Sequence, residues 1–309
     1  MADHGPILEV DGLSVSYRAP EGRRVAVDQL SFTVERGEIF GLVGESGSGK
    51  SSTAFAILGL IKPPGRIDAG RIVLDGVDLR AQAGERMRSL RWRKLSLVPQ
   101  GAMNALNPVM RVGDQLRDVI ETHEGRSGRR TLEERIAGLF ASVGLPAQAA
   151  RSYPHELSGG MKQRVCVAMA VALKPDLIIA DEPTSALDVV VQRAVAETLR
   201  SVQRQIGASV ILIGHDLGLQ AQLVHRLGVM YRGRLVEIGP TRELFHRPQH
   251  PYTELLVSSA PSIRSTDRGG SVIGAAARAR ELADAADRLV TSGLPPLRTV
   301  GPDHLAALP

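Results

Sequence analysis

Hydrophobic positions along the first hundred residues fall into short runs separated by turn residues, a pattern typical of alternating strands and helices. A run of branched residues at 39–43 predicts a buried strand, and the Gly-rich turn after it leads into a helical pattern at 50–60. Residues 63–70 combine a Pro pair with two Gly and predict a loop. Further strands are predicted at 8–17, 25–34, 71–74 and 95–99.

The middle of the chain changes character and then returns to the first pattern. Loop signals extend from 101 to 128, and helical spacing follows at 131–143 and from Met161 to a stop before Pro175. Strands are predicted at 177–180 and 209–213, a helix at 189–205, and a hairpin at 227–238 around Arg232-Gly233. We therefore expect an α/β core at 1–100 and 172–262, interrupted by a helical subdomain over about 101–171.

The last segment, 263–309, carries scattered Gly, Ser and Pro and predicts an appendage outside the core. One helix is expected there at 275–290, with Gly293 and Pro295-Pro296 as stop signals. The segment also holds no cysteine, because the chain's one cysteine is Cys166.

Composition narrows the function classes. With 43% hydrophobic and 23% charged residues the chain can bury a core, which argues against extensive disorder. Only one Trp, four Tyr and five Phe are present, so a base-stacking platform for single-stranded nucleic acid is not expected. The net charge is +5, and the densest basic run, 86–94, is interpreted as a solvated helix face rather than a nucleic-acid patch.

The sequence also bears on where the protein works. Its apolar stretches are too short to span a bilayer, and no secretory signal pattern precedes residue 11. A single cysteine cannot form an intramolecular disulfide or a Cys-rich metal site. We expect a cytoplasmic protein.

The turn after the strand at 39–43 has chemistry of its own. It fits the pattern G-x-x-x-x-G-K-[ST], with a strand before it and a helix after it. Glycines let the backbone turn tightly, so that N–H groups at the helix N-terminus can hold phosphate oxygens. Lys50 is expected to reach the β- and γ-phosphates, and the Ser51 hydroxyl to bind Mg²⁺. The candidate nucleotide-binding residues here are Gly44, Glu45, Ser46, Gly47, Ser48, Gly49, Lys50, Ser51 and Ser52.

A second group of candidate catalytic residues follows the buried run at 177–180. That run ends in Asp181 and Glu182, at the sheet edge where α/β proteins place ligands. Asp181 is expected to hold Mg²⁺ through its water shell, and Glu182 to polarise the attacking water as a general base. Together with the phosphate loop, these residues predict Mg²⁺-dependent ATP hydrolysis.

Between the phosphate loop and the acidic pair, residues 157–164 read Leu-Ser-Gly-Gly-Met-Lys-Gln-Arg. Here the chain resembles the ATP-binding cassette family, whose signature is LSGG-x-[QKR]-Q-R, and the resemblance extends over most of 8–260. It implies a P-loop NTPase (RecA-like) α/β core with an antiparallel β subdomain, an inserted α-helical subdomain and a short C-terminal extension. It also implies that Ser158, Gly159 and Gly160 face the γ-phosphate of a nucleotide bound by an opposing subunit.

The resemblance assigns roles to further residues. Tyr17 matches the aromatic residue that stacks on adenine, and Gln100 matches the glutamine that contacts Mg²⁺ and the attacking water. Residues 185–188, ending in Asp188, match the loop that crosses the dimer interface. His215 matches the histidine that senses the γ-phosphate. Because one chain carries one cassette, the family's logic requires a second cassette, identical or sister.

Four segments resemble the subfamily that serves oligopeptide, dipeptide and nickel importers. They are 103–108, 111–115, 153–157 and 250–256, the last reading His-Pro-Tyr-Thr-Glu-Leu-Leu. Members of this subfamily often carry a cysteine-rich tail for an iron–sulfur cluster. Here the tail is shortened, Cys166 is expected to be a small buried residue, and no cluster is expected. The tail's retained parts are 294–296 and 300–304.

The resemblance favours an ATPase subunit that energises the import of di- or oligopeptides. Nickel or another small solute is an alternative, and a non-transport cassette ATPase acting on ribosomes or DNA is a further one. The expected partners are two transmembrane permease subunits, a second cassette and, through the permease, an extracytoplasmic solute-binding protein, with no direct nucleic acid. The expected cofactors are ATP and Mg²⁺, and the expected location is the cytoplasmic face of the membrane.

Overall fold

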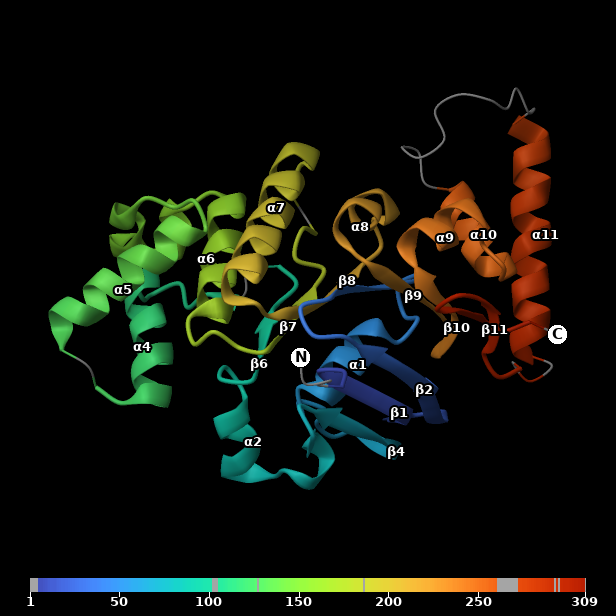
Figure 1. Cartoon of the computed structure of the whole chain (residues 1–309), viewed down its shortest axis with the longest axis horizontal. Helices are drawn as coiled ribbons and strands as arrows, with labels where there is room; N and C mark the ends of the chain where they lie inside the picture. The colour runs from blue at the N-terminus through green and yellow to red at the C-terminus, as the bar shows by residue number, and fades with distance from the viewer. Residues whose placement is uncertain are drawn as a thin grey trace. The chain divides into compact units, whose positions relative to one another are not determined.

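The computed structural model of the chain (Figure 1) describes residues 5–101, 105–126, 128–185, 187–259, 272–291, 293 and 295–308. It divides into two compact units, which we describe in turn. The first comprises residues 1–8, 34–38 and 73–213, and the second comprises 9–33, 39–72 and 214–309.

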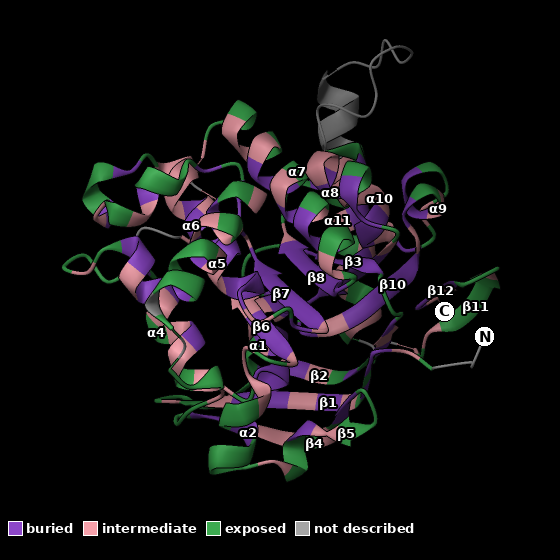
Figure 2. Ribbon diagram, turned by 60° about the vertical axis from the view of Figure 1, so that its left-hand side comes forward, coloured by how far each residue is buried: buried purple, intermediate pink, exposed green. Residues whose placement is uncertain are grey.

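The first unit is built on a parallel sheet. Its elements are β5 (Val77–Asp78), η1 (Leu79–Ala81), α2 (Gly84–Leu90), β6 (Leu95–Val98), α4 (Val112–Glu124), α5 (Arg129–Ser142), η2 (Ala147–Arg151), η3 (Pro154–Glu156), α6 (Gly159–Val171), β7 (Leu177–Asp181), α7 (Val189–Ile206) and β8 (Ser209–Gly214). Strand β7 pairs in parallel with β6 on one side and β8 on the other. All five residues of β7 are buried, as expected for a strand with both faces covered (Figure 2).

Helices α4, α5 and α6 pack on one another within this unit (Figure 1). The predicted loop at 101–128 is wrong over 112–124, because α4 occupies those residues. Its apolar face is narrow, with Val112, Leu116 and Ile120 buried at a spacing of four. The Gln115 side chain fixes the preceding segment, because it accepts the Asn107 backbone N–H and donates to two backbone carbonyls. Residues 103 and 104 of the subfamily motif lie outside the described residues.

Cys166 is buried on α6, which confirms the packing role predicted for it. Burial raises the pKa of its thiol to about 12.

The second unit combines two sheets. Its elements are β1 (Leu8–Ala19), β2 (Gly22–Val34), β3 (Ile39–Val43), α1 (Lys50–Ile57), β4 (Gly65–Leu74), α8 (Leu217–Leu223), β9 (Arg226–Tyr231), β10 (Arg234–Pro240), α9 (Thr241–His246), α10 (Pro251–Ser258), α11 (Val272–Thr291), β11 (Arg298–Gly301) and β12 (His304–Ala306). Strands β2, β1 and β4 are neighbours in that order in one sheet. In the other, β3 pairs in parallel with β9, and β9 forms the expected hairpin with β10.

Strand β4 begins at Gly65, so the loop predicted at 63–70 is wrong over most of its length. The glycine that suggested a turn serves a close approach instead. A Cβ on Gly70 would lie 2.5 Å from the Leu13 backbone, and its φ of +96° suits glycine. Asp68 forms ion pairs with Arg23 and Arg66, so polar partners stabilise the part of β4 that precedes its buried apolar residues at 72–74.

The C-terminal segment is not a mere appendage, which corrects the sequence-based expectation. The helix expected at 275–290 is present as α11, which packs on α10. Beyond it, β12 pairs antiparallel with β10, with Ala306 opposite Glu237 and Leu305 opposite Ile238. Ala306 and Ala307 are fully buried. The last described residues therefore complete a core sheet through pairs that lie 67 and 69 residues apart in sequence, which local patterns do not reveal. Residue 294 of the tail motif lies outside the described residues.

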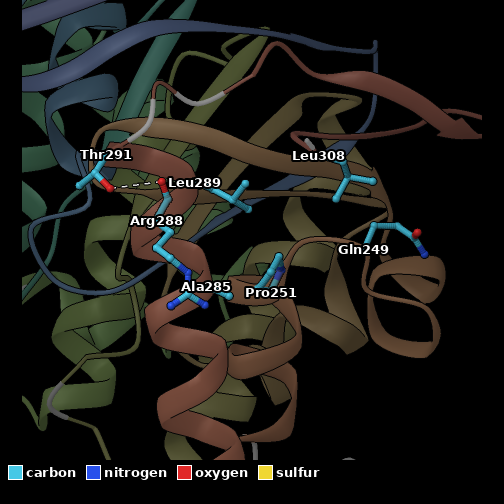
Figure 3. A pocket seen from close by; sticks show the side chains of 7 residues that line it. All are labelled: Gln249, Pro251, Ala285, Arg288, Leu289, Thr291 and Leu308. Carbon is cyan, nitrogen blue, oxygen red and sulfur yellow. Dashed lines mark hydrogen bonds between the residues drawn. The ribbon is translucent and has the colours of Figure 1, made fainter.

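A pocket of about 690 Å³ remains where the extension meets the start of α10 (Figure 3). Gln249 and Pro251 line it from the cassette, and Arg288, Leu289 and Leu308 line it from the extension.

Candidate functional site

The phosphate loop lies in the second unit. Strand β3 is buried over its whole length and delivers the chain into the loop 44–49, and α1 begins at Lys50. The Lys50 ammonium is almost fully buried and donates to the Gly44 and Glu45 carbonyl oxygens at 2.7 Å and to Ser48 Oγ at 3.2 Å. The loop is thus wrapped around its own lysine.

Two glycines of this loop are required by close contacts. A Cβ on Gly44 would lie 2.2 Å from the Met230 carbonyl oxygen, and a Cβ on Gly49 would lie 2.4 Å from the Ala26 carbonyl oxygen. Both also have positive φ values, +151° and +105°. The loop therefore presses against the backbones of β9 and β2. Ser46 and Gly47 lie on its outer side, where a Cβ on Gly47 would meet open space.

Tyr17 is the aromatic residue predicted to bind nucleotide, and it lies in the same unit as the phosphate loop. Its hydroxyl lies 3.2 Å from Ser52 Oγ in the first turn of α1, and its ring abuts Gly65. The structure thus brings together Tyr17 and Ser52, two of the residues predicted to bind nucleotide. His215, in the same unit, is exposed directly after β8, and Asp216 caps α8. Ser51 lies in the first turn of α1.

The predicted acidic residues lie in the first unit. Asp181 ends β7 and is only 4% exposed. Glu182 follows with a φ of +43°, and its backbone N–H donates to the Ile213 carbonyl at 2.9 Å. A left-handed conformation is strained for a glutamate, and such strain is concentrated at functional sites. Gln100 Nε2 donates to Glu182 Oε2 at 2.8 Å, so the structure brings two separately predicted catalytic residues into contact across 82 residues of sequence.

The signature residues also lie in the first unit. Ser158 is the N-cap of α6, and its hydroxyl accepts the Met161 backbone N–H at 3.3 Å. A Cβ on Gly160 would lie 2.5 Å from a Val191 methyl, and one on Gly159 would lie 3.2 Å from Leu187. The two glycines therefore let α6 approach the start of α7. Asp188 caps α7 through Oδ1, which accepts the Val191 N–H at 3.0 Å. Residue 186 lies outside the described residues.

One residue at the phosphate loop was missed by sequence reasoning. The hydroxyl of Tyr252 accepts the Glu45 backbone N–H at 2.9 Å. The run His-Pro-Tyr at 250–252 was interpreted only as a subfamily marker. The available signal was a tyrosine after a His-Pro cap in a chain with four tyrosines in all.

The oxygen donors predicted for Mg²⁺ fit that ion chemically. Ser51, Gln100 and Asp181 offer a hydroxyl, an amide and a carboxylate, and Mg²⁺ prefers hard oxygen ligands alongside substrate phosphates. Within the described residues no group of three His, Cys, Asp or Glu side chains is gathered to hold a metal. In the same part of the chain, no helix has the length and apolarity needed to cross a membrane.

Family models match two regions of the chain. One described as "ABC transporter" matches residues 27–185, and one described as "Oligopeptide/dipeptide transporter, C-terminal region" matches residues 236–285.

Several curated proteins are similar over most of the chain. The dipeptide transport ATP-binding protein DppD of Escherichia coli (strain K12) is 43% identical over 257 residues, which cover 82% of this chain and 78% of DppD. The oligopeptide transport ATP-binding protein OppD of Salmonella typhimurium is 43% identical over 261 residues, covering 84% and 77%.

Solved structures agree in fold. The cassette MJ0796, in a dimeric post-hydrolysis state bound to ADP and Pi, has a TM-score of 0.68 at 24% identity and covers 76% of this chain and 99% of its own. The protein cbiO1 from Clostridium perfringens has a TM-score of 0.66 at 22% identity, covering 81% and 95%. The P-loop NTPase fold expected from the sequence is thereby confirmed. With a family model over half its length and relatives at 43% identity, the chain belongs to the ATP-binding cassette (ABC) transporter family.

Proposed function

We propose that this chain is the ATP-hydrolysing subunit of an importer for di- or oligopeptides. Membership of the ABC family and the C-terminal model of the oligopeptide/dipeptide type support the transport role. The dipeptide and oligopeptide transport relatives support the substrate class. The single observation that carries the catalytic part is the hydrogen bond from Gln100 to Glu182 at the end of β7.

The residues divide the work of phosphoryl transfer to water. Lys50 and the loop amides from Glu45 to Ser52 bind the phosphates of ATP, and Tyr17 contacts the adenine. Ser51, Gln100 and Asp181 hold Mg²⁺. When bound, that ion neutralises charge on the phosphate oxygens. His215 contacts the γ-phosphate and reports its loss.

Glu182 acts as the general base. Gln100 donates to its Oε2 atom and so fixes the carboxylate, which accepts a proton from the attacking water. A general base of this kind contributes about 10²–10⁴-fold to a rate.

The assembly requires a second cassette. Ser158, Gly159 and Gly160 contact the nucleotide held by that cassette, and Asp188 lies at the interface between the two. Two permease subunits receive the motion, an extracytoplasmic binding protein delivers the peptide, and the chain sits on the cytoplasmic face of the membrane. The dimeric cassette MJ0796 supports the two-cassette arrangement.

The catalytic proposal is tested with Glu182→Gln, a change that keeps size and removes the base. ATP turnover by the assembled complex should fall at least about 100-fold, with ATP affinity kept within about threefold because Glu182 contributes little to ground-state binding. Glu197→Gln, an exposed glutamate on α7, is the matched control and should turn over at the wild-type rate. Equal turnover by Glu182→Gln and wild type would contradict the general-base role.

The substrate class is tested by uptake. Cells lacking the chain should lose import of a labelled dipeptide and regain it with wild type but not with Glu182→Gln. Restoration of ⁶³Ni²⁺ uptake with no effect on peptide uptake would contradict the peptide assignment and leave the ATPase role intact.

A further inference from the structure

Tyr252 contacts the phosphate loop from the buried interior of the second unit. Its ring is 1% exposed on α10, and its hydroxyl is the acceptor for the Glu45 N–H, the second residue of the loop. A loop amide held in this way cannot rotate freely, so the loop is kept in one conformation before nucleotide arrives.

The ring of Tyr252 is in turn held by Tyr231 at the end of β9. The two ring centroids are 4.2 Å apart, with the planes inclined by 33°. The Tyr231 hydroxyl donates to Asp287 Oδ1 on α11, and Arg232 Nη2 donates to Asp287 Oδ2 at 2.8 Å. Side chains therefore run without a break from the C-terminal extension to the phosphate loop.

The backbone of the same hairpin touches the loop as well. The Gly233 N–H donates to the Ser48 carbonyl at 3.0 Å, and the Met230 carbonyl lies against Gly44. Residues 230–233 thus contact the phosphate loop with their backbone, while Tyr231 and Arg232 reach α11 with their side chains.

The extension also fixes the start of α10. Glu237 is fully buried, and its Oε1 lies 2.7 Å from His304 Nε2 on β12. The Gln249 and His250 backbone N–H groups donate to the two oxygens of the same carboxylate at 2.9 Å. Because His250 immediately precedes α10, the last strand of the extension helps to hold the helix that carries Tyr252.

We propose that Tyr252 is a positioning residue for the phosphate loop and that the C-terminal extension, through Asp287 and Tyr231, regulates the nucleotide affinity of its own cassette. The inference rests on the proposed nucleotide site. Asp287 and Arg232 are about half exposed, so a partner that engages α11 can reach this contact and loosen the loop.

The test measures equilibrium binding of the non-hydrolysable analogue AMP-PNP with Mg²⁺ to the full chain. Tyr252→Phe keeps the ring and removes the hydroxyl, and its Kd should rise about 3- to 10-fold, as expected for one lost hydrogen bond. Asp287→Asn should raise the Kd at least about twofold, since a neutral amide binds Tyr231 and Arg232 more weakly. Asp284→Asn, an exposed aspartate on the same helix, is the matched control and should bind as wild type.

The outcomes separate the two claims. Lys50→Ala that binds AMP-PNP like wild type would overturn the proposed nucleotide site itself. If Lys50→Ala loses binding while Tyr252→Phe stays within 1.5-fold of wild type, on the order of measurement error, the positioning role alone is overturned. Equal Kd values for Asp287→Asn and Asp284→Asn would overturn regulation by the extension.

A purely structural role would lower the unfolding temperature of the variants and leave the Kd of the folded protein unchanged. Asp287→Asn keeps the test open if Tyr252→Phe does not fold.

Discussion

The protonation state of His250 affects the folding stability of the chain. The ring is fully buried at the N-cap of α10, where Nδ1 accepts the Tyr252 backbone N–H at 3.1 Å. That role requires the neutral imidazole with its proton on Nε2. Burial lowers the pKa of His250 from its ordinary value of 6.5 to about 4.

The sign of the resulting pH effect follows from proton binding. Between pH 6.5 and 4 the unfolded chain binds a proton at His250 and the folded chain does not, so stability falls as the pH drops through this window. His250→Asn keeps a capping acceptor and cannot titrate. Urea unfolding at pH 7 and pH 5 should therefore show a smaller loss of unfolding free energy in the variant, by on the order of 2 kcal/mol. The same loss in both proteins would contradict the assignment.

At the scale of elements, two helices of the first unit make opposite use of glycine. Gly138 is exposed within α5, where an added Cβ would meet nothing within 4 Å. Gly113 is buried in the first turn of α4, where a Cβ would lie 2.6 Å from the Ala150 carbonyl oxygen. The first glycine only weakens its helix, and the second lets α4 approach η2.

These two positions form a matched pair of substitutions. Gly138→Ala should raise the unfolding free energy by about 0.5–1 kcal/mol, because alanine restricts the unfolded chain and favours the helix. Gly113→Ala should lower it by about 1–3 kcal/mol, because the backbone of η2 must move. Urea unfolding of the two variants beside wild type measures both. Effects of the same sign would contradict the packing described for α4.

Elements that depend on their own composition could be predicted from the sequence, and elements that depend on tertiary partners could not. Strands β3, β7 and β8 carry runs of branched residues buried on both faces, so their own composition identifies them. Helix α4 and the first part of β4, residues 65–70, have few buried apolar side chains, and close approaches to Ala150 and Leu13 hold them in place. Strand β12 depends on its pairing with β10 on one side and β11 on the other.

The candidate site residues also differ in how far the sequence predicts them. The family resemblance singled out Gln100, and the acidic pair after a buried strand singled out Glu182, but their contact is visible only in the structure. The link from Glu45 to Tyr252 spans 207 residues and joins a backbone amide to a hydroxyl. Local sequence patterns hold no information on such a pair, because only the tertiary fold brings them together.

At the scale of the whole molecule, the proposal requires partners outside the chain. Tagged Glu182→Gln captured from native membranes with ATP should retain two permease subunits, a second cassette and a solute-binding protein, because blocked hydrolysis holds the closed assembly. Mass spectrometry identifies the captured proteins, and the same capture without ATP is the control. Recovery of ribosomal or DNA-bound proteins in place of permeases would contradict the transport role.

The strand pair β11–β12 also has a consequence for solubility. Strand β10 would otherwise offer an open row of backbone groups, and β12 covers it, with the Ala307 N–H donating to the Val236 carbonyl at 2.8 Å. The outermost strand, β11, is short and carries the exposed Arg298 and Thr299 (Figure 2). Short, charged outer strands discourage pairing with a neighbouring chain. A chain cut before residue 298 would expose the apolar strand β10 instead, and would self-associate edge to edge.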